Sequence, residues 1–290
     1  MKLLKIALHI SLKKTVTNKN LKILKKVKSL KIENSDIWIN EALFGFSQIK
    51  DYCDNLKSEG NLLEIGSGSG VLLSMLKEKY NNLKIEGIEP FGDGFSSLRE
   101  IYTKLPNKNI KVFNKSFEEF RPKKKYDIVF CINVIEHLKD WKEFLKKVHS
   151  YLKKDGKLII LAPNYDFPFE SHFKIPIIIN KKITFFVFQK YINRFEKINN
   201  CVGLWESLNF VKKSQIYFEC KKLVNQPYVL DDKLSIIEIM IKRFIEDDKL
   251  RKRQLVLGTF AIYLKKFGLL KLLKLFPRFI PYMKLILIKK

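Results

Sequence analysis

A glycine-rich turn after a short apolar segment is the feature that most constrains how this chain can fold. Residues 62–65 are apolar apart from Glu64, and they pass directly into the turn Gly66-Ser67-Gly68-Ser69-Gly70. Because glycine has no Cβ, such a turn lets backbone N–H groups approach a bound ligand closely. A dinucleotide-binding turn needs a further glycine where the next helix packs on its strand, and Val71 occupies that position here. The spacing acid-x-Gly-x-Gly-x-Gly therefore argues against a dinucleotide.

Short apolar segments continue to alternate with helix-like segments along the next hundred or so residues. The fourth of them, 126–132, is almost wholly apolar, as expected for a parallel strand that is covered on both faces. This alternation predicts an α/β fold with a parallel sheet and helices on both of its faces. The predicted strands are 62–65, 84–88, 110–113, 126–132 and 157–162.

A second carboxylate lies at the end of the second predicted strand. Glu89 follows Gly70 by 19 residues and is itself followed by Pro90. A carboxylate in this position can accept hydrogen bonds from both hydroxyls of a ribose. The turn and Glu89 together therefore predict a nucleoside-containing cofactor.

Four segments, taken in order, resemble the motifs of the class I S-adenosylmethionine-dependent methyltransferases. They are Glu64–Gly70, Glu89-Pro90, Tyr126–Val129 and Leu152–Leu158. The resemblance implies a Rossmann-like, doubly wound, mostly parallel sheet of seven strands, with the last strand antiparallel. We expect the two remaining strands within 205–225. The implied cofactor is S-adenosyl-L-methionine.

The same resemblance assigns the cofactor contacts. Glu64 and the glycines would hold the methionine end, Glu89 the ribose, and the segment Asn114–Phe117 would face the adenine. The predicted cofactor-binding residues are Glu64, Gly66, Ser67, Gly68, Gly70, Glu89, Ser116, Phe117 and Asn133.

The segment Asn133–Leu138, after the fourth predicted strand, narrows the resemblance. It is similar to the branch that includes ubiquinone-biosynthesis O-methyltransferases and bacterial sugar and glycolipid methyltransferases. Some members have Glu-x-x-Glu-His here, which is proposed to hold a divalent metal. Asn133 replaces the first glutamate, so the sequence predicts no metal site. His137 lies at the strand exit, where open α/β sheets bind ligands, and it would act as a general base or a metal ligand, or merely cap the helix and order the loop.

An aromatic-rich insertion at about 165–200 follows the fifth predicted strand. Glu170 and His172 lie two residues apart in it, so an extended segment would present both on one face as candidate substrate contacts. The alternative is that both are solvated while the aromatic residues pack. A hydroxyl acceptor needs a proton acceptor near neutral pH, and histidine is the usual one. The predicted catalytic residues are His137, His172 and Glu170.

The net charge of +26 is concentrated at the two ends of the chain. Residues 1–32 hold ten Lys, and residues 251–290 hold eight Lys and three Arg, without any acid in either segment. Such ends favour a polyanionic partner, either membrane or nucleic acid. The chain lacks an Asp/Asn-Pro-Pro-aromatic motif after the fourth strand and any Pro-Cys pair, so nucleic acid is disfavoured. An apolar helical face favours a membrane, and its residues are Leu269, Leu272, Leu273 and Phe276.

These features predict three regions: a basic helical extension at 1–35, a methyltransferase core at 36–225, and a basic helical region at 226–290. The predicted function is O-methylation of a small-molecule, glycan or lipid-linked substrate at a membrane surface. The alternatives are an RNA methyltransferase and a non-catalytic binding protein on this fold. Four scattered Cys without a CxxC pair, and no signal peptide, predict a cytoplasmic protein, and the basic ends favour a peripheral position on the inner face of the cell membrane.

Overall fold

The computed structural model separates the chain into two compact units. The first comprises residues up to 132, together with 147–158 and 289, and the second comprises 133–146, 159–288 and 290. The structure describes residues 18–32, 35–56, 59–92, 96–105, 110–225, 227–231, 233–246, 250, 255–269 and 280–290.

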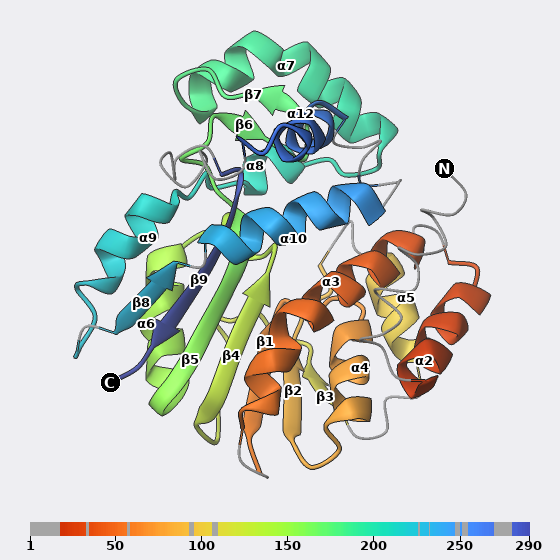
Figure 1. The fold of residues 1–290 in the computed structure, drawn as a ribbon, viewed down its shortest axis with the longest axis vertical. Helices are drawn as coiled ribbons and strands as arrows, with labels where there is room; N and C mark the ends of the chain where they lie inside the picture. Colours follow the sequence, from red (N-terminus) through yellow and green to blue (C-terminus); the bar gives the residue numbers. More distant parts are fainter. Residues whose placement is uncertain are drawn as a thin grey trace. The chain divides into compact units, whose positions relative to one another are not determined.

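Seven strands form one mostly parallel sheet in the order β3-β2-β1-β4-β5-β9-β8 (Figure 1). Strand β1 pairs in parallel with β2 and β4, and β2 pairs in parallel with β3, whereas β8 and β9 are antiparallel. This confirms the predicted Rossmann-like fold class. The strands are β1 Asn61–Ile65, β2 Lys84–Ile88, β3 Lys111–Phe113, β4 Tyr126–Ile132, β5 Leu152–Pro163, β8 Tyr228–Asp231 and β9 Tyr282–Ile288.

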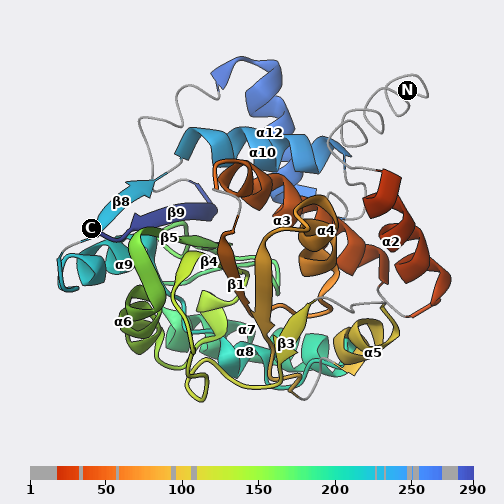
Figure 2. The same cartoon turned by 90° about the horizontal axis from the view of Figure 1, so that it is seen from below.

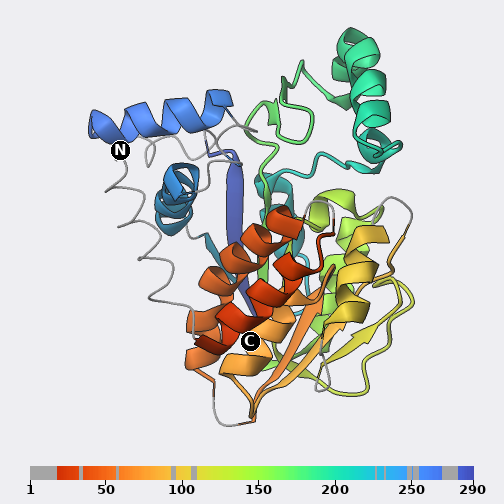
Figure 3. The same ribbon diagram turned by 90° about the vertical axis from the view of Figure 1, so that its right-hand side faces the viewer.

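In the first unit, three helices pack beside one another near β1 and β2. Helices α2 (Asn18–Ser29), α3 (Ser35–Asp54) and α4 (Val71–Lys79) contact one another, as Figure 3 shows, and α4 contacts β2. Strands β1, β2 and β3 lie side by side in Figure 2. The unit also contains α5 (Ser96–Lys104). Helix α3 buries an apolar face at helical spacing that includes Ala42, Phe46, Ile49 and Cys53.

The second unit holds the insertion and most of the remaining helices. Its hairpin, β6 (Phe169–Glu170) and β7 (Ile175–Pro176), is antiparallel, and helix α10 contacts both α12 and β9. The helices that lie within this unit are η1 Ile135–His137, α7 Lys181–Ile198, α8 Leu204–Ser207, α9 Lys213–Cys220, α10 Lys233–Glu246 and α12 Leu255–Lys266; α6 Trp141–Tyr151 spans both units.

The prediction that 205–225 supplies the last two strands is wrong. That segment forms α8 and α9, and the strands are β8 and β9 instead. Strand β9 lies between β5 and β8, and six of its seven residues are buried. An interior strand needs a nearly continuous apolar segment, which 282–288 provides and which 205–225, with its interspersed Lys and Glu, does not. The C-terminal region is therefore not wholly helical.

Three of the four residues of the predicted membrane-binding face, and the first part of the basic N-terminal segment, lie outside the described residues. Leu269 is described and exposed, whereas Leu272, Leu273, Phe276 and residues 1–17 are not described. Within the described ranges, the helices are too short or too polar for a bilayer span.

Asn164 joins three segments of the second unit and provides a test of its packing. Its backbone N–H and its Nδ2 donate to the carbonyls of Pro281 and Ile280 at 2.9 and 3.0 Å, and its Oδ1 accepts from the Lys213 N–H at 3.3 Å. Because the side chain is buried, Asn164→Ala should leave the Ile280 carbonyl and the Lys213 N–H without these partners, while the backbone bond to Pro281 remains. We expect a loss of about 2–3 kcal/mol in the free energy of unfolding, measured in urea. Asn193→Ala, at an exposed position, is the control, and an equal loss in both variants would contradict this account.

Candidate active site

The glycine-rich turn adopts the backbone conformation for which its glycines are required. Gly66, Gly68 and Gly70 have φ values of 74°, 49° and 69°, which residues with a Cβ rarely adopt. The N–H groups of Gly66 and Ser67 donate to the carbonyl of Ile88, so the turn is tied to the end of β2. Helix α4 begins directly after Gly70. The turn is therefore held between the ends of β1 and β2.

Gly87 is a residue of this region that sequence reasoning missed. A Cβ at this position in β2 would lie 2.6 Å from Ser67 Oγ and 2.7 Å from Leu73 Cδ1. Glycine thus allows the turn and helix α4 to approach the strand closely. In the sequence the only sign of this role is a glycine inside an otherwise strand-like segment.

Glu64 is a buried carboxylate at the end of β1. Burial, and then the charge of Glu89, raise its pKa well above the ordinary value. Its Oε2 has no hydrogen-bond partner among the residues that the structure describes. A buried carboxylate of this kind is stabilised by a cationic or N–H donor.

Glu89 lies at the end of β2 and contacts the glycine turn directly. Its Oε2 accepts from the Gly68 N–H at 2.8 Å, and its Oε1 accepts from the Phe91 N–H at 3.2 Å. Burial raises the pKa of Glu89, although these two hydrogen bonds lower it in part. Each carboxylate oxygen has a second lone pair, so both can accept from a ligand as well.

Three further residues of the predicted cofactor site have local roles in the structure. Ser116 Oγ accepts from the Glu119 N–H at 3.4 Å, and Phe117 is buried. Asn133 has a φ of 54°, its N–H donates to the Leu161 carbonyl, and its Oδ1 accepts from the Tyr282 hydroxyl at 2.8 Å. Their contacts with a cofactor stay predictions.

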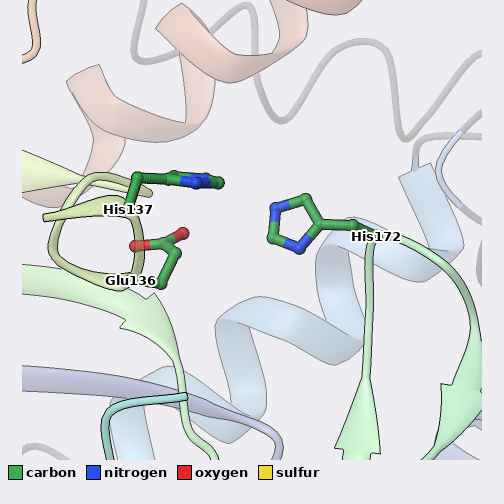
Figure 4. Close-up of side chains that lie close together, drawn as sticks. All are labelled: Glu136, His137 and His172. Atoms are coloured by element: carbon green, nitrogen blue, oxygen red, sulfur yellow. The ribbon is translucent and has the colours of Figure 1, made fainter. Parts of the chain in front are cut away.

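In the second unit, three side chains converge that sequence reasoning did not bring together. Glu136 and His137 come from η1, directly after β4, and His172 comes from the turn between β6 and β7. One ligand-type atom from each lies within 4.8 Å of the others. Figure 4 shows the His172 ring pointing toward the His137 ring, with the Glu136 carboxylate beside His137.

Hydrogen bonds fix which nitrogen of each ring carries the lone pair. Ser207 Oγ donates to the Leu204 carbonyl, so it accepts from His137 Nδ1 at 3.0 Å. Burial, and then the charge of His172, lower the pKa of His137 to about 4, and the ring is therefore neutral with its lone pair on Nε2. His172 Nδ1 lies 2.6 Å from Glu170 Oε1, which places the lone pair of the neutral His172 ring on Nε2 as well.

Glu170 positions His172, and its own environment does not favour the predicted contact with substrate. The side chain is buried, Tyr165 donates to its Oε1, and the Phe173 N–H donates to its Oε2. Burial alone would raise the pKa of Glu170, but its hydrogen bond with His172 and the other contacts lower it below the ordinary value. Glu170 is therefore a carboxylate that orients the His172 ring.

Glu136 belongs to the segment Asn133–Leu138 but is not among the predicted site residues. It is fully buried, and neither of its carboxylate oxygens has a hydrogen-bond partner on another described residue. Burial raises its pKa to about 7, although the charge of His172 acts in the opposite direction. Asn209 holds the segment around it, because its N–H donates to the Glu136 carbonyl and its Nδ2 donates to Ile135 and Leu138.

The cluster of Glu136, His137 and His172 presents mainly hydrogen-bond acceptors. Two Nε2 lone pairs and a carboxylate attract a hydrogen-bond donor such as a hydroxyl group. The same imidazole nitrogens and carboxylate are also suitable ligands for a divalent cation, and Glu170 and Ser207 would orient the two rings. The sequence-based expectation of no metal rested on Asn133 and did not consider His172, which supplies a third potential ligand.

The fold and the glycine turn define a class I methyltransferase architecture. Residues 41–212 match the family model described as a methyltransferase domain. The chain therefore belongs to the methyltransferase family, which confirms the resemblance found in its sequence.

Relatives at moderate identity share only part of their length with this chain. An uncharacterised protein of Mycobacterium tuberculosis is 32% identical over 174 residues, which cover 59% of each chain. The ubiquinone biosynthesis O-methyltransferase of Rickettsia akari is 28% identical over 37% of this chain and 41% of its own. The pavine N-methyltransferase of Thalictrum flavum is 27% identical over 47% and 36%. This chain thus spans about three fifths or less of the length of these relatives.

Two solved structures share the fold. A phosphoethanolamine N-methyltransferase of Haemonchus contortus, in complex with S-adenosylhomocysteine, has a TM-score of 0.51 at 15% identity over 84% of this chain and 52% of its own. The plantazolicin methyltransferase BpumL, also with S-adenosylhomocysteine, has a TM-score of 0.51 at 13% identity over 98% and 99%. At these identities the likeness concerns the fold alone.

Proposed function

We propose that this protein is an S-adenosylmethionine-dependent methyltransferase that methylates a hydroxyl group of a small-molecule, glycan or lipid-linked acceptor. Membership of the methyltransferase family supports the transfer of a methyl group. The acceptor-rich cluster of Glu136, His137 and His172 is the observation that carries the choice of a hydroxyl, because it offers lone pairs to an O–H donor.

The first unit would hold the cofactor. The unpartnered Glu64 oxygen suits the ammonium group of the methionine end, and the glycines of the turn would let that end of the cofactor approach the backbone closely. Glu89 would accept from the two ribose hydroxyls while it keeps its bond to Gly68. These contacts would give the Glu64 and Glu89 carboxylates further hydrogen bonds, which the described residues do not supply.

The second unit would handle the acceptor proton. In the reaction the acceptor oxygen forms a bond to the methyl carbon while the bond between that carbon and the sulfonium sulfur breaks. The hydroxyl proton would pass to Nε2 of His172, with His137 as the second candidate, and the cofactor would supply the activated methyl group. Alignment of oxygen, carbon and sulfur supplies much of the rate, roughly 7–11 kcal/mol of the barrier.

The named relatives also favour a second candidate, N-methylation, since several of them are N-methyltransferases by name. Transfer of labelled methyl groups from S-adenosylmethionine to fractionated cell extracts, with and without the enzyme, distinguishes the two. An ether or ester product supports the proposal, and a methylated amine would overturn the choice of a hydroxyl. Absence of labelled product in every fraction would favour a non-catalytic binding protein.

Chelation tests whether the cluster of Glu136, His137 and His172 accepts a proton or binds a metal. We expect EDTA to leave turnover unchanged within about twofold, because Glu170 already orients His172 and no cation is needed for that role. The measurement is the rate of methyl transfer before and after dialysis against EDTA, with a buffer-dialysed control. Activity that is lost and then restored by a divalent ion would assign the cluster to metal binding.

We also propose that the reaction takes place at the inner surface of the cell membrane. The support is the acid-free basic composition of residues 1–32 and 251–290, which suits an anionic leaflet. RNA is the alternative polyanion, and co-sedimentation with vesicles and with RNA compares the two.

A further inference from the structure

Helix α7, in the second unit, has an inner face that is fully engaged. Ile192 belongs to a buried aromatic cluster with Phe173 and Trp205, and Phe185 and Phe188 pack against it. Glu196 is buried as well, and its carboxylate accepts from the N–H groups of Gly203 and Trp205. The inner face therefore explains why this segment forms a helix here, but it accounts for only half of the apolar side chains of α7.

The outer face carries large apolar side chains in water. Phe186 is 83% exposed and Val187 is 55% exposed, and Ile183 lies one turn before them. Residues spaced by three and four positions share one face of a helix, so these three form a continuous apolar patch. Ile179 and Ile198, near the two ends of the helix, are also exposed. Exposed aromatic and aliphatic side chains that gather on one helix commonly mark an interaction surface.

The charged side chains on the outer face of α7 are all positive. Lys182, Lys190, Arg194 and Lys197 are exposed on α7. The only acid between residues 171 and 205 is Glu196, which is buried on the other side of the helix. The outer face thus combines apolar and cationic side chains without an exposed carboxylate.

We propose that the outer face of α7 binds an anionic membrane surface, with Phe186 and Val187 inserted among the lipids and the basic residues at the headgroups. An amphipathic helix with Lys or Arg beside large apolar residues lies in the plane of such an interface. With 18 residues, α7 is about 27 Å long and could place all of these groups at one level. The long Lys and Arg side chains can keep their charges at the headgroups while their stems cover apolar surface.

Charge complementarity selects this occupant over a second copy of the chain. A symmetric contact through α7 would bring two sets of cations together without a carboxylate to pair them. An anionic leaflet instead attracts each basic residue, worth roughly fivefold in binding. The proposal goes beyond the methyl-transfer reaction, and it does not depend on the identity of the acceptor.

The test is co-sedimentation of the full chain with phosphatidylcholine vesicles, with and without phosphatidylserine. The variant Phe186→Ser/Val187→Ser is compared with Phe218→Ser/Val224→Ser, a second exposed Phe–Val pair, which is 64% and 75% exposed. We expect the α7 variant to bind phosphatidylserine vesicles at least about tenfold more weakly than wild type, and the matched control to bind normally. Circular dichroism and S-adenosylmethionine affinity should be unchanged in both, because these side chains are exposed.

A charge variant completes the test. Lys190→Gln/Arg194→Gln should weaken binding to phosphatidylserine vesicles at low salt by about 25-fold, and by less at high salt. The proposal is overturned if the α7 variants bind like wild type, which would leave the basic chain ends as the membrane contacts. Equal binding to vesicles without phosphatidylserine would also overturn it, as would a wild-type dimer in light scattering that Phe186→Ser/Val187→Ser dissociates.

Discussion

Replacing His172 with alanine should lower the turnover of methyl transfer by about 10²- to 10⁴-fold, the usual contribution of a positioned proton acceptor. The reason is that the Glu170 carboxylate holds His172 Nδ1 at 2.6 Å and leaves its Nε2 lone pair for the acceptor proton. The affinity for S-adenosylmethionine should change by less than about twofold, since His172 does not belong to the predicted cofactor residues. Single-turnover kinetics and calorimetry measure the two quantities separately.

Two further variants show whether His172 acts directly. Lys174→Gln changes an exposed residue of the same insertion and should keep wild-type turnover. Glu170→Gln removes the charge that orients the ring, and it should lower kcat with little change in KM for the acceptor. If His172→Ala keeps near wild-type turnover, His137→Ala becomes the decisive variant. Normal turnover in both would mean that the proton goes elsewhere.

Replacing Glu89 with glutamine should weaken S-adenosylmethionine binding by about 30- to 150-fold, which corresponds to about 2–3 kcal/mol. Glutamine keeps the size of the side chain and one carbonyl acceptor, but it cannot accept at both terminal atoms. The structure places both Glu89 oxygens against backbone N–H groups of the turn and the following segment. The variant therefore loses charge-assisted hydrogen bonds to the ribose and part of the hold on Gly68. Isothermal calorimetry measures the change.

Glu86→Gln is the matched control for this experiment. Glu86 lies on the same strand, but its carboxylate accepts from the Tyr126 hydroxyl and pairs with Lys124 instead of contacting the turn. We expect its cofactor affinity to stay near that of wild type. Unchanged affinity in a folded Glu89→Gln protein would remove Glu89 from the site. Tighter binding of NAD than of S-adenosylmethionine would contradict the cofactor assignment.

Variants of the three proposed sites should each change a different measured property. Variants of Glu64 and Glu89 should act on cofactor affinity, whereas variants of His137, His172 and Glu170 should act on turnover. Variants of the α7 outer face should change neither and act on vesicle binding alone. A change in all three properties in one variant would indicate a folding defect, which circular dichroism would detect.

The sequence by itself determined the part of the fold that local chemistry specifies. Three glycines at alternate positions favour a turn with left-handed backbone, and the short apolar segments bounded by turns favour strands of a covered sheet. The positions of Glu64 and Glu89 follow in the same way, because Glu64 lies near the end of β1 and Glu89 directly follows β2. These features depend on neighbours within a few residues, so their pattern can be read along the chain.

The tertiary structure decided what depends on residues far apart in sequence. Whether 205–225 or 282–288 enters the sheet depends on which segment can be buried on both faces, and 56 residues separate the two segments. The approach of His172 to Glu136 and His137 depends on how the β6–β7 hairpin folds back, and the buried position of Glu170 depends on the packing around Tyr165 and Phe173. Likewise, one half of the apolar residues of α7 is buried and the other half is exposed, and only the aromatic cluster beneath the helix determines which half faces water.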